Sequence, residues 1–87
     1  MNMKTFSYTI TDPVGIHARP AGMLAKKAKE FQSEITVQKG DRSANATRLI
    51  AVMGLCIKCG DTVTVTVTGE DEHTAALELE RFFQTNL

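Results

Sequence analysis

The chain has 87 residues, of which 43% are hydrophobic, and its ten basic residues balance its ten acidic ones. This length predicts a single domain over residues 1–87, with little room for a deep substrate cavity. The charge balance disfavours nucleic acid and anionic membranes as partners, because both bind an excess of Lys and Arg. Since no apolar run reaches the ~18 residues of a membrane span and no secretory signal opens the chain, we expect a cytoplasmic protein without membrane insertion.

The first half of the chain predicts a strand, a helix and a hairpin. Residues 4–11 alternate, with Phe6, Tyr8 and Ile10 on one side, as in a strand with one wet face. Residues 18–31 carry apolar side chains at helical spacing, and Pro20 suits the first turn of a helix. Residues 34–38 and 42–46 are typical of two short strands joined by a turn at 39–41.

The second half predicts a short helix, a strand and a final helix. Asn45 and Thr47 are alternative caps for a helix that runs to about Met53. Residues 62–68 alternate valine with threonine, which is typical of a strand, and acidic residues at 70–72 suit the positive end of the last helix. The order is β-α-β-β-α-β-α, an α+β pattern. Half-wet strands predict an antiparallel or mixed sheet with helices on one face.

The stretch Gly15-Ile16-His17-Ala18-Arg19-Pro20 places a histidine where a helix begins. The free N–H groups near His17, Ala18 and Arg19 favour an anion there. A neutral imidazole can attack phosphorus to form a phosphoramidate, and an arginine can bind the phosphoryl oxygens. No Asp or Glu is expected nearby to act as a base, and a neutral ring nitrogen needs none. We therefore predict His17 and Arg19 as catalytic residues, and Ala18 and Arg19 as phosphate-binding residues.

Other roles for His17 have to be weighed. A lone histidine at a helix start is usually a cap or a solvated side chain. Only His73 could join it in a metal site, and no further ligand lies at a useful local spacing, so we expect no metal and no cofactor. A Ser–His–Asp or Cys–His triad stays open, although no nucleophile-elbow motif is present.

The six-residue stretch resembles the active-site signature of the HPr family, the histidine phosphocarriers of the bacterial sugar phosphotransferase system. The similarity extends to residues 29–31, 33–37, 52–53, 60 and 69–72. It implies an open-faced β-sandwich, with four antiparallel strands covered on one side by three helices. It also implies a carrier rather than an enzyme. His17 would accept phosphate from Enzyme I on its δ nitrogen and donate it to the IIA domains of sugar permeases, with help from Arg19.

The signature is shared with related proteins, so an alternative stays open. The chain could be an HPr-like carrier or regulator in a non-sugar circuit, such as the nitrogen-linked branch or the dihydroxyacetone kinase branch. In either circuit we expect a monomer.

The predicted short helix indicates a docking surface. It has more apolar side chains than one face can bury, and exposed apolar groups beside a reactive residue suggest partner contact. In HPr-like proteins the matching helix contacts Enzyme I and IIA proteins, so we expect Leu49, Ile50 and Met53 to be contacts and Val52 to lie inside. The alternative is that all of these residues fill a small core.

The chain departs from the family pattern at Arg48. Many HPr proteins of Gram-positive bacteria have a regulatory serine there, which a kinase phosphorylates. Alignment through Val52-Met53 places Arg48 at this position, so control by that kinase is not carried over to this chain. Our hypothesis is that Arg48 is a further docking residue whose fixed positive charge favours acidic partners.

A second departure is Cys56-Ile57-Lys58-Cys59, which has the spacing of a redox motif or half a zinc site. Two cysteines cannot make a four-Cys zinc site, and a thioredoxin-like pair should open a helix after a strand. We therefore expect reduced thiols that are buried or half-buried. The remaining alternative hypothesis is that the chain is a thiol redox protein.

Overall fold

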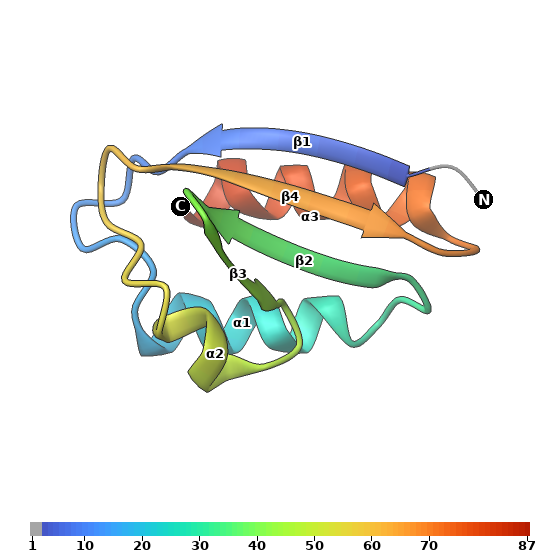
Figure 1. Ribbon diagram of the computed structural model, residues 1–87, viewed down its shortest axis with the longest axis horizontal. Helices are drawn as coiled ribbons and strands as arrows, with labels where there is room; N and C mark the ends of the chain where they lie inside the picture. Colours follow the sequence, from blue (N-terminus) through green and yellow to red (C-terminus); the bar gives the residue numbers. More distant parts are fainter. Residues whose placement is uncertain (1–2) are drawn as a thin grey trace.

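The computed structural model describes residues 3–87 as one sheet and three helices. In chain order the elements are β1 (Met3–Thr9), α1 (Ala18–Ala28), β2 (Glu34–Lys39), β3 (Arg42–Asn45), α2 (Leu49–Met53), β4 (Thr62–Thr68) and α3 (Glu72–Asn86). The strands pair antiparallel in the order β1-β4-β2-β3. The helices lie on one side of this sheet and leave the other side open (Figure 1). The predicted open-faced β-sandwich is confirmed.

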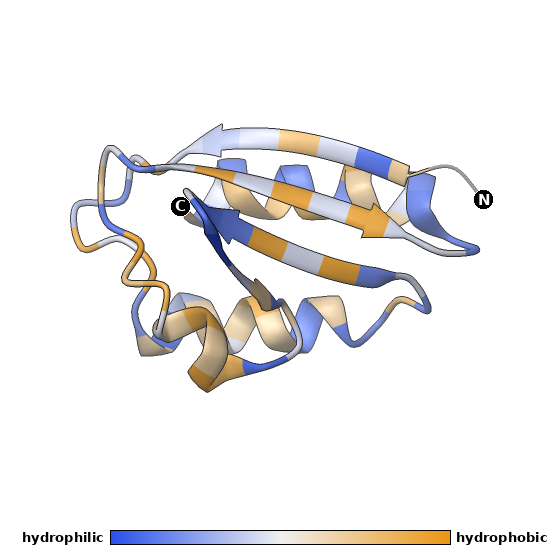
Figure 2. Ribbon diagram, in the orientation of Figure 1, coloured by the Kyte–Doolittle hydropathy of each residue, from blue (hydrophilic) through white to orange (hydrophobic). Residues whose placement is uncertain are grey.

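The core lies between the sheet and the helices, and the alternation of the strands creates it. Val63, Val65 and Val67 of β4 are fully buried, whereas the threonines between them are at least partly exposed. The register sets Val65 between Phe6 of β1 and Val37 of β2, so that one face of three strands is apolar. The same alternation is visible along β2 and β4 in Figure 2.

Aromatic packing fixes α3 against the sheet. The Phe83 side chain is completely buried. Its ring meets Phe6 and Tyr8 of β1 edge-on at centroid distances of 5.8 Å, and Phe82 at 6.0 Å. Such edge-to-face pairs stabilise a core beyond the burial of their area. This packing holds the C-terminal end of α3 near the end of β1, where the functional residues gather.

Two predicted elements end earlier than expected. The first helix ends at Ala28 rather than Phe31, because the N–H groups of Glu30 and Phe31 donate to carbonyls three residues back, as in a tightened last turn. The first strand ends at Thr9 rather than Thr11, because the Thr11 N–H turns away to donate to the Leu87 carbonyl at 2.6 Å.

Neither proposed cap begins the short helix. Arg48 is the N-cap of α2, and its side chain makes no capping hydrogen bond. The Asn45 side chain instead accepts hydrogen bonds from the N–H and the hydroxyl of Thr47, at 2.9 and 2.6 Å. This local turn uses the polar groups before the helix starts.

Asp71 joins the start of α3 to the segment before β2. Its carboxylate accepts hydrogen bonds from the N–H groups of Gln32 and Ser33, each at 2.9 Å, and from the Ser33 hydroxyl. The Ser33 hydroxyl, followed by the Gln32 N–H, lowers the pKa of Asp71 from its ordinary value of 3.8. Hydrogen bonds to the charged form have this effect on a carboxyl.

The Asp71 carboxylate should therefore make the fold sensitive to acid. A lowered pKa in the folded state stabilises the protein above pH 3.8, and this stabilisation disappears as the pH falls through the folded-state pKa. We expect Asp71→Asn to lower the urea midpoint at neutral pH and to lose less stability than the parent between about pH 5 and pH 2. Asp41→Asn, in the exposed β2–β3 turn, is the control. Equal acid sensitivity of the Asp71→Asn variant and the parent would contradict this role.

Candidate functional site

His17 directly precedes α1, and its side chain is exposed. It is the N-cap residue, with extended backbone angles (φ −115°, ψ −167°), and its ring makes no capping hydrogen bond. Its carbonyl accepts the N–H of Ala21 at 2.9 Å, which starts the helical ladder. The imidazole therefore holds no structural place as a cap, and it stands in solvent at the positive end of a helix.

The loop before His17 is fixed by a close approach to the loop after α2. Gly15 has φ +80°, and a Cβ there would lie 2.5 Å from the Ile57 carbonyl oxygen and 2.7 Å from the Lys58 Cα. Only glycine suits both the left-handed backbone and this contact. The N–H of Ile16 donates to the same Ile57 carbonyl at 3.0 Å, and the Ile16 side chain is buried. His17 thus follows a rigid anchor.

The first turn of α1 supplies unpaired donors beside His17. The helical ladder begins at the Ala21 N–H, so the N–H groups of Ala18 and Arg19 precede it, and Pro20 has none. Ala18 is exposed, at the position where the sequence predicts phosphate binding. Such a first turn favours a bound anion.

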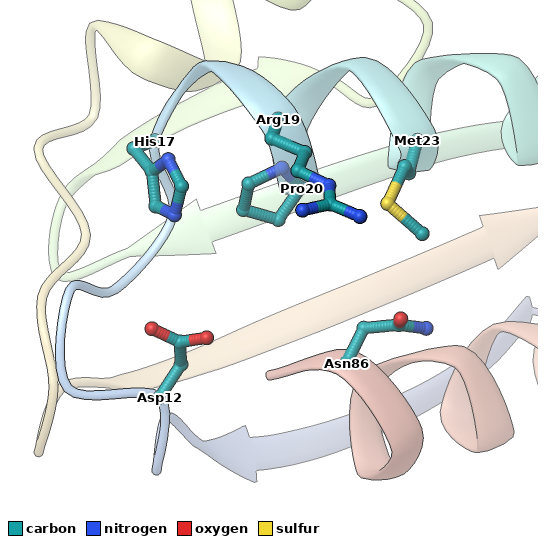
Figure 3. A pocket seen from close by; sticks show the side chains of 6 residues that line it. All are labelled: Asp12, His17, Arg19, Pro20, Met23 and Asn86. Carbon is teal, nitrogen blue, oxygen red and sulfur yellow. The ribbon is translucent and has the colours of Figure 1, made fainter.

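Arg19 reaches over a hollow that His17 borders. Six residues line this hollow, which has a volume of about 230 Å³ and which we call the His17 hollow: Asp12, His17, Arg19, Pro20, Met23 and Asn86. Figure 3 shows the Arg19 guanidinium projecting from α1 toward it. Arg19 is exposed. Within residues 3–87 the cations in ion pairs are Lys27 and Lys39, so no carboxylate holds the Arg19 guanidinium. The structure brings together the predicted pair, His17 and Arg19.

Sequence reasoning missed two polar residues of the hollow. No Asp or Glu was expected near His17 as a base, but the Asp12 carboxylate lines the same hollow, across from the ring (Figure 3). Asp12 precedes His17 by only five residues, and its place before Pro13 was visible as a turn signal. Asn86 comes from the far end of the chain, and its amide donates to the Phe82 carbonyl at 3.0 Å. No local pattern indicates that Asn86 reaches the hollow.

The predicted docking residues lie on α2 and at its N-cap, Arg48, and this helix packs against α1 and β3. Ile50 is 76% exposed and Leu49 36%, whereas Val52 is fully buried, as expected. Met53 is half-buried and packs against the core, and Arg48 is exposed. The alternative hypothesis, that all apolar residues of this helix fill the core, is therefore wrong.

The two cysteines are free and exposed, so the expectation of buried or half-buried thiols is wrong. The chain turns sharply at Cys56, which has φ +54° and whose carbonyl accepts the Lys39 ammonium group at 2.7 Å. The Cys59 thiol lies 3.8 Å from the Thr11 carbonyl. Across residues 3–87 no three His, Cys, Asp or Glu side chains gather as a metal site would need, and no helix is long and apolar enough to cross a membrane.

Both the sequence and the fold of this chain are similar to those of known proteins. A family model described as the PTS HPr component phosphorylation site matches residues 4–85. Phosphocarrier protein HPr of Lysinibacillus sphaericus is 48% identical over 73 residues, which are 84% of this chain and 83% of that protein. The solved histidine-containing phosphocarrier protein of a Mycoplasma has a TM-score of 0.88 at 38% identity, covering 91% of this chain and 90% of its own. HPr of Thermoanaerobacter tengcongensis, solved as a dimer, has a TM-score of 0.75 at 31% identity, covering 90% of each chain.

Proposed function

The chain belongs to the HPr family of phosphocarriers of the phosphotransferase system, and on this premise we propose that His17 is the residue that carries the phosphoryl group. The family role is that of a carrier in a relay, not of an enzyme. We propose further that the single domain works in the cytoplasm, receives the group from Enzyme I and passes it to the IIA domains of sugar permeases.

One observation carries the assignment to His17: its imidazole is exposed at the start of α1, beside N–H groups outside the helical ladder. An acceptor in a relay has to be reached by two other proteins in turn, which a buried ring would prevent. The oxygens of a transferred phosphoryl group would lie near the N–H groups of Ala18 and Arg19. These donors are fixed before the reaction, so they need no reorganisation to stabilise charge.

The transfer is a displacement at phosphorus. The lone pair of the ring δ nitrogen attacks, a new N–P bond forms, and the bond from phosphorus to the donor protein breaks with its electrons returning to the donor. The ring proton stays on the ε nitrogen, and the phosphorylated ring therefore becomes cationic. Donation to a IIA domain is the reverse displacement. No proton has to leave His17 before the attack, because a neutral ring nitrogen is already a nucleophile.

Arg19 has the position and the freedom to help this step. Its guanidinium projects over the same hollow as the ring and is not committed to an ion pair within residues 3–87. A guanidinium can bind two phosphoryl oxygens at once, and it keeps its charge at any working pH. We propose that it stabilises the phosphoryl group most strongly during transfer, when charge spreads over the oxygens.

The proposed docking residues lie on α2 and at its N-cap: the exposed Leu49 and Ile50, the half-buried Met53, and Arg48 before the helix. Ile50, which is 76% exposed, should lose most solvent contact on docking. We expect Ile50→Ala to raise KM for this chain about five- to thirtyfold in phosphorylation by Enzyme I, with little change in kcat, because burial of such a side chain is worth about 1–2 kcal/mol. Kinetics with phosphoenolpyruvate and purified Enzyme I measure both constants.

Leu77→Ala is the matched control for Ile50. Leu77 is a 50% exposed apolar residue on α3, and it lines a separate hollow with His73. Its removal should leave KM unchanged. Equal KM values for the Ile50→Ala variant and the parent, or an equal rise in the Leu77→Ala variant, would contradict docking through α2.

Phosphoryl transfer to different acceptor proteins tests in which circuit the chain works. The phosphorylated chain is mixed with purified IIA domains of sugar permeases, with the IIA protein of the nitrogen-linked branch and with the phosphoryl-accepting subunit of dihydroxyacetone kinase. Fast transfer to the sugar IIA domains supports the proposal, and transfer only to one of the others overturns its sugar assignment. We also propose that the working form is a monomer, which leaves the imidazole open to each partner, although one HPr relative was solved as a dimer.

A further inference from the structure

Asp12 is held firmly at the wall of the His17 hollow. Its N–H donates to the Leu87 carbonyl at 2.8 Å, and its Oδ1 accepts the Val14 N–H at 2.9 Å. Among residues 3–87 no protein donor, the His17 ring included, bonds to its second oxygen, Oδ2, in this structure. The carboxylate is half-buried and lines the hollow together with His17. One oxygen therefore fixes the loop, and the other is available to the hollow.

The two nitrogens of the His17 ring face different surroundings. In Figure 3 the nitrogen farther from the backbone, Nε2, lies on the side of the ring toward Asp12, and Nδ1 lies on the side toward the helix. The other polar side chains that line the hollow are Arg19, which can only donate hydrogen bonds, and Asn86, whose amide already donates to Phe82. Asp12 is thus the one anionic acceptor among the residues lining the hollow.

We propose that Asp12 is a positioning residue for His17: a turn of the exposed ring brings its Nε2–H to the free Oδ2 across the hollow, and this hydrogen bond keeps the ring proton on Nε2 and leaves Nδ1 free as the nucleophile. This rests on the proposed function of His17. A carboxylate that accepts the N–H of one ring nitrogen fixes which tautomer the imidazole adopts. After the attack of Nδ1 on phosphorus the ring is a cation with its proton still on Nε2, on the side of the ring toward Asp12 (Figure 3). No proton leaves the ring in the step, and none is added.

The Asp12→Asn variant replaces an acceptor by a donor at the free oxygen of residue 12, at nearly constant shape. The amide oxygen can still accept the Val14 N–H, which preserves the loop, and the NH₂ group then points to the hollow. An amide NH₂ is a donor, so it favours Nε2 as an acceptor and moves the ring proton to Nδ1. We expect the Nδ1–H fraction of His17 to rise at least about twofold and the phosphorylation rate to fall about ten- to hundredfold.

The test is ¹⁵N NMR of the His17 ring at about pH 9, where imidazole is neutral, with phosphorylation kinetics on the same samples. Asp41→Asn, a carboxylate of the β2–β3 turn, is the control and should change neither. An unchanged His17 tautomer ratio in the Asp12→Asn variant overturns the proposal, whatever the rate does. If the parent is phosphorylated at a residue other than His17, the proposed function fails, and the tautomer ratio still decides the Asp12 contact separately.

Discussion

Replacing His17 by alanine is expected to abolish phosphoryl uptake. The parent chain should gain the mass of one phosphoryl group when it is incubated with Enzyme I and phosphoenolpyruvate, and the His17→Ala variant should gain none, a fall in rate of at least about 10³-fold. The physical reason is that the proposed covalent intermediate needs a ring nitrogen, and His17 is the one imidazole among the residues that line the His17 hollow. Intact mass spectrometry at neutral pH measures the gain.

The chain offers its own control for this experiment. His73 is the other histidine of the sequence, and it lies exposed on α3, where it lines a different hollow beside β1. His73→Ala should take up phosphate at the parent rate. The ring of His17 is exposed and makes no capping hydrogen bond, so neither change should lower the thermal midpoint much. Phosphate on the His17→Ala variant at the parent rate would contradict the proposal.

Removal of the Arg19 guanidinium is expected to have the second largest effect. Arg19→Gln should lower kcat for phosphorylation by Enzyme I about 10²- to 10³-fold, which is the usual cost of losing one fixed donor to a transition-state oxygen. KM should change little, because the contact strengthens during transfer rather than on docking. Arg19→Lys should recover only part of the rate, since an ammonium group cannot make the forked contact.

The control for Arg19 is another exposed arginine. Arg42 lies on β3 and does not line the His17 hollow, so Arg42→Gln should leave kcat near the parent value. Initial rates of phosphorylation over a range of chain concentrations give kcat and KM separately for Arg19→Gln, Arg19→Lys and Arg42→Gln. If Arg19→Gln raises KM and leaves kcat intact, then Arg19 is a docking residue and does not stabilise the transfer.

The parts of the fold that local patterning controls were predicted closely from the sequence. The strand at Thr62–Thr68 has the predicted bounds, because its valines and threonines alternate without interruption. The end of α1 was misjudged because Phe31 keeps the helical spacing and remains half-buried after the helix has ended. An apolar pattern reports which side chain faces the core, but it does not report where the hydrogen-bond ladder stops.

In the candidate site, too, the residues that are adjacent in the sequence were predicted, and those brought in by long-range contacts were not. His17, Ala18 and Arg19 are adjacent in the sequence, so their meeting at one helix start follows from a single motif. Asn86 joins the hollow, and Asp12 is fixed at its wall, because the loop after β1 bonds to the end of the chain: the Leu87 carbonyl accepts the N–H groups of Thr11 and Asp12. Residues 11 and 87 are too far apart for any local pattern to predict this contact. Cys56 is exposed and has a left-handed backbone, and no local sequence signal indicated either feature.

The most direct measurement locates the phosphoryl group on the parent chain. The protein is incubated with Enzyme I and phosphoenolpyruvate, digested at a pH that preserves phosphoramidates, and its peptides are sequenced by mass spectrometry. We predict one acid-labile phosphoryl group, on the imidazole of His17. A stable phosphate on a hydroxyl side chain, or a labile one on His73, would contradict the central assignment.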